Sequence, residues 1–179
     1  ASRASVGASD VISLTELRTA VKTLRNNNAR YMAPDFGNSD QVGHGPIGRA
    51  YFCIVSPNLV PTLKGISGWT ARHAYPNPNM ILHDAEIGSI EEIRFLESTK
   101  AKVFSGAGAS SIDVYASIIF GANAYAVGDI DTGESGLIVK DLGSGGQDAL
   151  NQVGSIGVKQ RFGVVIQQQA AMIRIEHAI

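Results

Sequence analysis

The first regular pattern of apolar positions in the chain has helical spacing and follows Ser13. Ser13 and Glu16 form the S-x-x-E pair of a capping box, which marks the start of a helix. A run of asparagines, residues 26–28, ends the pattern, and residues 1–12 before it are small and polar. We therefore predict a linker or arm over 1–12, followed by a helix whose apolar face holds Leu14, Leu17, Ala20, Val21 and Leu24.

Most of the other regular patterns predict strands. Apolar runs or alternating apolar positions occur at Ala50–Val55, Glu86–Phe95, Ile112–Phe120, Tyr125–Val127, Leu137–Val139 and Ile173–His177. The second of these predicts a hairpin or a bulged strand. Further helical signals are limited to a short helix after Pro57 and one turn over Trp69–Tyr75, ended by Pro76 and Pro78. Helices are too few for alternating crossovers, so the fold class is α+β with mostly antiparallel pairing.

Two stretches rich in glycine predict irregular loops. Residues 31–48 also contain proline and form the longer one. A loop of this length inside a compact domain is uncommon, and it often serves a function or is held by a partner. Residues 143–146 predict a shorter, flexible loop.

The charges are few and unevenly distributed. Of the 179 residues, 44% are hydrophobic and 17% are charged, and the net charge of −1 gives no global case for nucleic-acid binding. Residues 1–80 nevertheless have a net charge of +4, and residues 81–179 one of −5. Opposite charges on two parts of one molecule suit head-to-tail contacts between identical subunits. The alternative is a chance distribution of solvated faces.

The single cysteine and the first residues of the chain indicate which disulfides and targeting signals the sequence allows. Cys53 has no partner for a disulfide within the chain and lies in an apolar run, so we expect a small core residue. No apolar stretch approaches the roughly 20 residues that span a bilayer. The first residues lack both an initiator Met and the apolar core of a signal peptide, and we expect a processed or excised piece of a longer protein.

None of the candidate reactive groups has the spacing of a known catalytic, cofactor or metal site. The glycines at 106–108 and 143–146 lack the Lys-Ser or Lys-Thr of a phosphate loop and do not complete a dinucleotide fingerprint. Cys53 has no activating neighbour in the sequence. The four histidines lie apart in the sequence, as His44, His73, His83 and His177. The sequence therefore predicts no catalytic, cofactor-binding or metal-binding residue, and no cofactor.

Two weaker candidates for a functional site consist mainly of charged side chains, one of carboxylates and one of cations. The segment His83-Asp84-Ala85-Glu86 carries oxygen and nitrogen ligands in an unspecific pattern. Glu91, Glu92 and Asp84 suit either acid–base chemistry or a solvated face. A basic surface is the second candidate, although its cations lack the exposed aromatic residues that nucleic-acid readers usually place among them. Its members are Arg3, Arg18, Lys22, Arg25, Arg30 and Arg49.

Longer segments carry more information than these motifs. In chain order they are SLTELRTAVKTLRNNN, YFCIVSPNLVPTLKG, GWTARHAYPNP, EIGSIEEIRFLEST, YASIIFGANAYAV, LIVKDLGSGGQDALNQVGSIGVKQRFGVVI and MIRIEHA. In amino-acid sequence and in their order along the chain, they resemble the major capsid protein of N-four-like tailed phages, over residues 13–178.

The resemblance implies the tailed-phage (Hong Kong-ninety-seven-type) capsid fold. Residues 1–12 would then be an N-terminal linker or arm, residues 13–136 an axial-domain-like region, and residues 137–179 strands that return to the peripheral domain. The family's N-arm, extended loop and long spine helix find no counterpart in the chain.

The resemblance also implies a structural role without enzyme activity. The chain would be a subunit, or part of one, of the icosahedral shell that encloses packaged phage DNA. Its partners would be identical subunits in pentamers and hexamers, with non-specific contact to double-stranded DNA and no membrane. The shell would belong to the virion and be assembled in the bacterial host cytoplasm.

Two other readings remain open at this point. An encapsulin-like compartment shell would have the same fold with protein cargo. A small α+β hydrolase or nucleotide-binding enzyme would use the glycine loops, and it predicts a deep pocket with converging polar groups.

Overall fold

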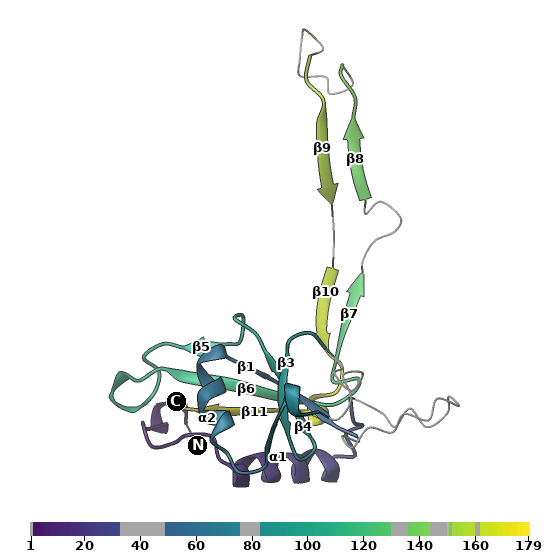
Figure 1. Ribbon diagram of the computed structural model, residues 1–179. Coiled ribbons are helices and arrows are strands. Elements are labelled where there is room, and N and C mark those ends of the chain that lie inside the picture. Colours follow the sequence, from purple (N-terminus) through teal and green to yellow (C-terminus); the bar gives the residue numbers. More distant parts are fainter. Residues whose placement is uncertain are drawn as a thin grey trace, which may run out of the picture. The chain divides into compact units, whose positions relative to one another are not determined.

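A computed structural model of the protein describes residues 2–32, 49–75, 83–129, 136–143, 150, 152–159 and 162–179 (Figure 1). The fold is mixed α+β and dominated by sheet, in agreement with the predicted class. Two compact units make up the chain. Unit 1 comprises Ala1–Ala124 with Gln168–Ile179, and unit 2 comprises Tyr125–Gln167. Most of the loop predicted at 31–48, together with His44, Pro76, Pro78 and residues 144–146, lies outside the described residues.

Helix α1 spans Leu14–Asn26 and begins at the predicted capping box. The Ser13 hydroxyl accepts a hydrogen bond from the Glu16 backbone N–H at 3.4 Å, and the Glu16 carboxylate accepts one from the Ser13 backbone N–H at 2.8 Å. Two of the amide donors that a helix start leaves unpaired are thereby satisfied. The predicted apolar face is buried at Leu17, Ala20, Val21 and Leu24.

The described part of unit 1 contains a seven-stranded sheet in the order β11-β6-β1-β4-β3-β2, with β5 paired to β6. Its strands are β1 (Tyr51–Val55), β2 (Trp69–Ala71), β3 (Glu86–Ile90), β4 (Ile93–Glu97), β5 (Val103–Phe104), β6 (Val114–Phe120) and β11 (Met172–His177). Only the β1–β4 pair among these is parallel, which confirms mostly antiparallel pairing. Strands β3 and β4 form the predicted hairpin, with a register shift between Glu86 and Gly88.

Short helical segments connect these strands. The predicted helix after Pro57 is a 3-10 turn, η2 (Pro57–Leu59), that continues into α2 (Val60–Lys64). The described residues also contain the 3-10 turns η1 (Arg3–Ser5), η3 (Arg72–Ala74), η5 (Ala109–Ser111) and η6 (Gln169–Ala171). No helix of the described residues is long and apolar enough to cross a membrane.

The helical turn predicted over Trp69–Tyr75 is wrong for its first half. Trp69–Ala71 form strand β2, which pairs with β3 through Trp69 and Ile90, and only Arg72–Ala74 are helical. The Trp69 ring lies 5.6 Å from the Phe95 ring, measured between centroids. Pairing and core packing therefore decide the conformation here, against the local pattern.

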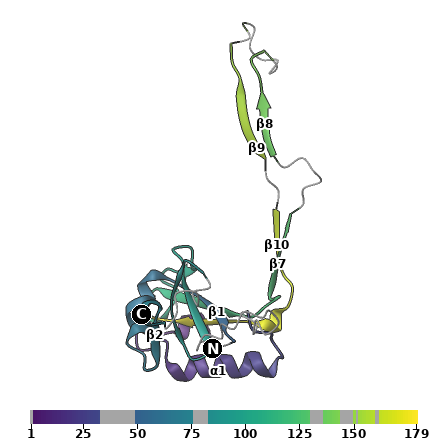
Figure 2. The same cartoon turned by 45° about the vertical axis from the view of Figure 1, so that its right-hand side comes forward.

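The core of unit 1 lies between α1, α2 and the sheet, and Figures 1 and 2 both show α1 running along the sheet. Cys53 is fully buried in this core, as predicted. Burial raises the pKa of its thiol well above the ordinary value because the thiolate would lose its hydration. The largest core side chains include Leu17, Leu24, Tyr51, Leu59, Leu63, Phe95 and Ile119.

Unit 2 contains two antiparallel ladders. Strand β7 (Tyr125–Asp129) pairs with β10 (Phe162–Ile166), and β8 (Gly136–Lys140) pairs with β9 (Ser155–Lys159). The chain passes from unit 1 to unit 2 after Ala124 and returns to unit 1 before Gln168, because β11 pairs along β6.

Candidate functional site

The segment His83–Glu86 is held by structural contacts. The His83 Nδ1 atom accepts a hydrogen bond from the Ala85 N–H at 3.0 Å, and Arg72 donates to the Asp84 carbonyl at 2.6 Å. Glu86 instead points into the protein, with its side chain fully buried. A cleft of about 560 Å³ lies beside this segment, lined in part by Arg72, Asp84 and Glu97. Among the described residues, no three His, Cys, Asp or Glu side chains are grouped closely enough to hold a metal ion.

Glu86 belongs to a buried polar cluster. The Tyr75 hydroxyl donates to its carboxylate at 2.9 Å, and the guanidinium of Arg94, also buried, lies 3.5 Å away. Burial raises the pKa of Tyr75 to about 12, so its hydroxyl keeps its proton at neutral pH. The cluster joins β3, β4 and the residues after η3. We assign it a role in folding, because its charged groups face one another inside the protein.

His177 and Ser117 form a second buried polar pair. The His177 Nδ1 atom lies 2.8 Å from the Ala178 carbonyl, and its Nε2 atom lies 2.8 Å from the Ser117 hydroxyl. A carbonyl only accepts, so Nδ1 carries the proton and Nε2 accepts from Ser117. Burial lowers the pKa of His177, because desolvation disfavours the imidazolium more than the Ala178 bond and the charge of Glu16 favour it. Tyr115 stacks beside this ring, at 6.4 Å between centroids.

Acidification is therefore expected to destabilise unit 1 through His177. The pKa of His177 is lower in the folded chain than in the unfolded chain, so the unfolded chain takes up this proton first as the pH falls. The contribution of this group to the free energy of unfolding should therefore decrease between pH 7.5 and 5.5. Urea denaturation of the protein and of His177→Gln at both pH values measures this loss as a difference. The matched control is His73→Gln, at an exposed position. An equal pH dependence in all three proteins would contradict the assignment.

Residues 2–12, expected to be a linker or arm, are fastened to unit 1. Arg3 donates two hydrogen bonds to Glu176, at 2.8 and 3.0 Å, and its guanidinium carbon lies 3.5 Å from the centre of the Phe104 ring. These bonds hold the pKa of Glu176 below its ordinary value. Asp10 accepts from the Ala178 N–H at 2.9 Å, and Val6 packs against Ala178 in a small apolar cluster. Both ends of unit 1 therefore meet beside β11.

Three further cations of the predicted basic surface, Arg18, Lys22 and Arg25, lie on α1. Arg18 donates to Glu91 at 2.6 and 2.9 Å, and Arg25 is paired with Glu92. These two carboxylates form the turn between β3 and β4, and Glu91 has a positive φ of 49°. A concavity of about 400 Å³ lies between helix and turn, lined by Arg18, Val21, Lys22, Arg25, Asn26, Glu91 and Glu92. We call it the α1 concavity.

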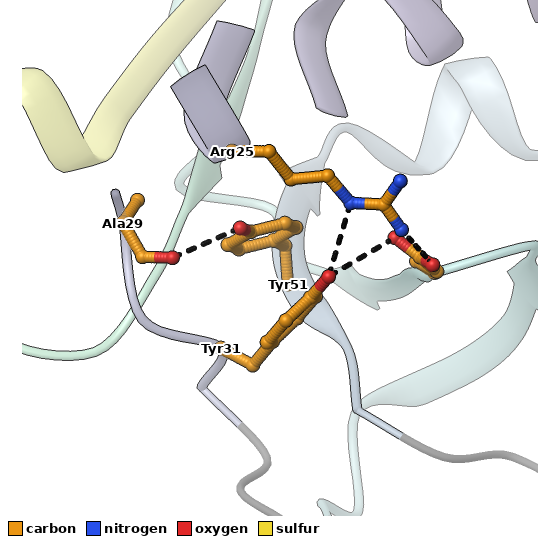
Figure 3. A network of polar contacts seen from close by, with 5 residues as sticks. Arg25, Ala29, Tyr31 and Tyr51 are labelled. Atoms are coloured by element: carbon orange, nitrogen blue, oxygen red, sulfur yellow. Dashed lines mark hydrogen bonds and ion pairs between the residues drawn. The ribbon is translucent and has the colours of Figure 1, made fainter. Parts of the chain in front are cut away.

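A tyrosine pair fixes one end of the α1 concavity (Figure 3). The Arg25 Nε–H donates to the Tyr31 hydroxyl at 3.0 Å, and this bond is the main cause that raises the pKa of Arg25. The Tyr31 ring stacks on Tyr51 at 4.6 Å, and the buried Tyr51 hydroxyl donates to the Ala29 carbonyl at 3.0 Å. Desolvation raises the pKa of Tyr51, so it remains a neutral donor. Arg25 is therefore held in one position by the core.

Gly106 and Gly143, from the two glycine-rich segments, adopt backbone conformations that favour glycine. Gly106 adopts a positive φ of 64°, and its N–H donates to the Asp113 carboxylate at 2.9 Å, which closes a turn. Gly143 also has a positive φ, of 86°. Both geometries favour glycine for conformational reasons.

Nearly all of the large exposed apolar side chains among the described residues belong to unit 2, and the sequence analysis did not predict this. In the β8–β9 ladder, Leu137 lies opposite Val158 and Val139 opposite Ile156. These four side chains share one face of the ladder, because strand side chains alternate. They are 55–78% exposed. The β7–β10 ladder adds Val127, Phe162, Val164, Val165 and Ile166, each more than half exposed. The sequence showed this segment only as the apolar run Leu137–Val139, which predicts a strand but not the exposure of its side chains.

Comparisons with known proteins identify the fold. No family model and no curated protein matches the sequence. Among solved structures, the capsid of Ralstonia phage GP4 is similar over 99% of this chain, with a TM-score of 0.69 and 17% sequence identity. The chain spans about half the length of that capsid chain, 50% of it being covered. The described fold is therefore that of a phage capsid protein, as the resemblance in the sequence implied at this coarser level.

Proposed function

We propose that this protein is a structural subunit, or part of one, of a phage capsid shell. The observation that carries the proposal is the exposed apolar surface of unit 2, in a chain whose fold is shared with a phage capsid. Exposed patches that contain many neighbouring apolar side chains mark protein–protein interaction sites. We expect identical subunits to cover this surface, because a closed shell of identical subunits buries the same patch on every copy.

The β8–β9 ladder has two unlike faces. One holds Leu137, Val139, Ile156 and Val158, and the other presents Lys140, Ser155 and Lys159 together with Ile138. Full burial of such an apolar side chain stabilises a protein by roughly 1.5–3 kcal/mol. Four such side chains on each copy therefore provide a substantial driving force for association. One face of the ladder is suited to contact protein, and the other remains hydrated.

The finer parts of the proposal follow from the sequence resemblance. In the Hong Kong-ninety-seven-type fold of N-four-like tailed phages, residues 13–136 would be an axial-domain-like region and residues 137–179 strands that return to the peripheral domain. Subunits would form pentamers and hexamers around double-stranded DNA, touching it without sequence specificity. The shell would be assembled in the host cytoplasm and become part of the virion. The protein would have no enzyme activity, cofactor or membrane partner.

Substitutions in unit 2 test the proposal. Replacing Ile156 and Val158 by Thr keeps β-branched side chains in β9 but makes the apolar face polar. We expect assembled particles to be lost, with at least a tenfold rise in the concentration needed for assembly, while unit 1 melts at an unchanged temperature. Sedimentation velocity measures the particles, and calorimetry measures the melting.

The control for this variant lies on the opposite face of the same ladder. Ile138→Thr makes a similar chemical change beside Gly157, where no apolar partner is present across the ladder. Assembly of this control should resemble that of the unchanged protein. Equal assembly by the double variant would contradict a role for the apolar face.

A further inference from the structure

Residues 2–6, which we call the strap, are anchored to unit 1 by a charged side chain. Arg3 donates two hydrogen bonds to Glu176 on β11, and its guanidinium carbon lies 3.5 Å from the centre of the Phe104 ring on β5. The Glu176 side chain is 17% exposed, so the ion pair is partly shielded from water. A guanidinium suits this place, because it offers two parallel N–H groups to a carboxylate and stacks on an aromatic ring.

A second anchor follows three residues later. Val6 packs with Val114 and Ala178 in an apolar cluster that is separate from the main core. The Val6 carbonyl accepts a hydrogen bond from the Ala109 N–H at 2.8 Å. The neighbouring residue must be small, because a Cβ atom at Gly108 would lie 2.8 Å from the Val6 carbonyl oxygen. The protein therefore has a surface that is shaped to receive the backbone of the strap.

We call this surface the strap site. It combines a carboxylate, an aromatic ring, an apolar cluster and a backbone donor. Its residues are Phe104, Gly108, Ala109, Val114, Glu176 and Ala178. An occupant must present an arginine and, three residues later, a small apolar side chain. The segment that the structure shows in the site, with Arg3 and Val6, meets both requirements.

A turn over residues 7–10 connects the strap to the rest of unit 1. The Gly7 N–H donates to the Asp10 carboxylate at 2.8 Å, and the Asp10 N–H donates to the Gly7 carbonyl at 3.0 Å. Residues 8–10 are exposed, and the next side chain in the main core is that of Ile12. Opening this turn breaks two local hydrogen bonds and leaves the main core unchanged. Segments with few buried contacts open at the lowest free-energy cost in a protein.

We propose that the strap site binds the strap of a second copy of this chain, so that neighbouring copies exchange residues 2–6. Exchange preserves every contact between strap and site and changes only the turn over residues 7–10, and such swaps of identical segments are a low-cost route to association. The inference rests on the proposed function, since neighbouring subunits of a shell supply the second strap at a high effective concentration. It adds a specific link within unit 1 to the apolar contacts proposed for unit 2.

Zero-length cross-linking distinguishes exchange from attachment within one chain. Arg3→Lys keeps the positive charge and introduces an amine, which a carbodiimide joins to a carboxylate in contact with it. Assembly from a mixture of ¹⁵N-labelled and unlabelled protein marks the two copies. We expect cross-links from position 3 to Glu176 that join a labelled peptide to an unlabelled one. Cross-links confined to single copies of the assembled protein would overturn the inference and leave the shell proposal intact.

Complementation between two charge variants tests the exchange independently. In Arg3→Glu and in Glu176→Arg, the strap and the site of the same chain repel each other. In a mixture, each strap is opposite in charge to the site of the other variant. The mixture should therefore associate about tenfold more tightly than either variant alone. Sedimentation equilibrium measures the association, and thermal melting verifies that each variant is folded.

The matched control is a mixture of Lys64→Glu with Glu176→Arg. It has the same net charges, but the change to glutamate lies at an exposed position on α2 and leaves the strap unaltered. We expect no gain in association from this mixture. An equal gain in both mixtures would show that net charge alone drives association, which would overturn the inference but not the shell proposal. Absence of association in the unchanged protein at high concentration would overturn both.

Discussion

Replacing Arg94 by Met is expected to destabilise unit 1 by roughly 3–5 kcal/mol at neutral pH. The Arg94 side chain is 3% exposed and its partner Glu86 is 0% exposed, with 3.5 Å between the charged atoms. Methionine fills much of the same space but leaves the Glu86 carboxylate buried without this counter-charge. The Tyr75 hydroxyl, which donates to Glu86 at 2.9 Å, would remain. Urea denaturation followed by circular dichroism measures the loss.

Two further variants make this result specific. Arg18→Met removes an ion pair with Glu91 in which both side chains are well exposed, so we expect almost no change in stability. The double variant Arg94→Met with Glu86→Gln should recover much of the loss, because no uncompensated charge remains buried. Similar effects of Arg94→Met and Arg18→Met would show that the buried pair has no special role.

Gly121→Ala should destabilise unit 1 by roughly 1–3 kcal/mol, the range for overpacking in a dense core. A Cβ atom at Gly121 would lie 2.3 Å from the Arg30 carbonyl oxygen and 3.3 Å from the Tyr51 ring. The backbone has little freedom to move away. Gly121 N–H donates to the Ala171 carbonyl at 3.0 Å, and the next residue donates to Arg30 at 2.9 Å.

The control for the steric argument is Gly7→Ala. A Cβ atom there meets its nearest neighbour, an oxygen of Asp10, at an ordinary 3.8 Å. Stability should remain within about 0.5 kcal/mol of the unchanged protein. Thermal melting of both variants measures the difference, and a larger loss at Gly7 than at Gly121 would contradict the explanation.

Elements encoded by neighbouring residues were predictable from the sequence. Helix α1 begins at Ser13 because the cap and the apolar spacing both lie within a few residues of the start. The β3–β4 hairpin was likewise predicted, since its turn, Glu91 and Glu92, directly joins the two strands. Strand β2 was missed because its conformation depends on pairing with β3 and on packing of Trp69 against Phe95.

Contacts between distant residues account for what the sequence did not predict. The return of β11 to β6 places the last residues in unit 1, and no local pattern indicates which strand they pair with. Arg18 and Arg25 were identified in the sequence only as members of a candidate basic surface. Their partners Glu91 and Glu92 are 73 and 67 residues away, so the α1 concavity became visible only in the fold.

The exposure of the apolar face of unit 2 could not be predicted from the sequence, for a different reason. The apolar run Leu137–Val139 predicts a strand, in which Leu137 and Val139 lie on the same face. Periodicity alone does not reveal whether that face is covered by the same chain or by another. The exposure of these side chains is a property of the folded molecule, and it is what makes association the central expectation.

Electron microscopy of the intact protein that contains this sequence tests the central claim most directly. The protein is expressed in bacteria, purified without denaturant and imaged in vitreous ice. The account predicts closed icosahedral shells of uniform size, with unit 1 and unit 2 of every copy in contact with neighbouring copies. A monodisperse monomer at high concentration, with the apolar face of unit 2 exposed to water, would contradict the proposal that this chain builds a capsid.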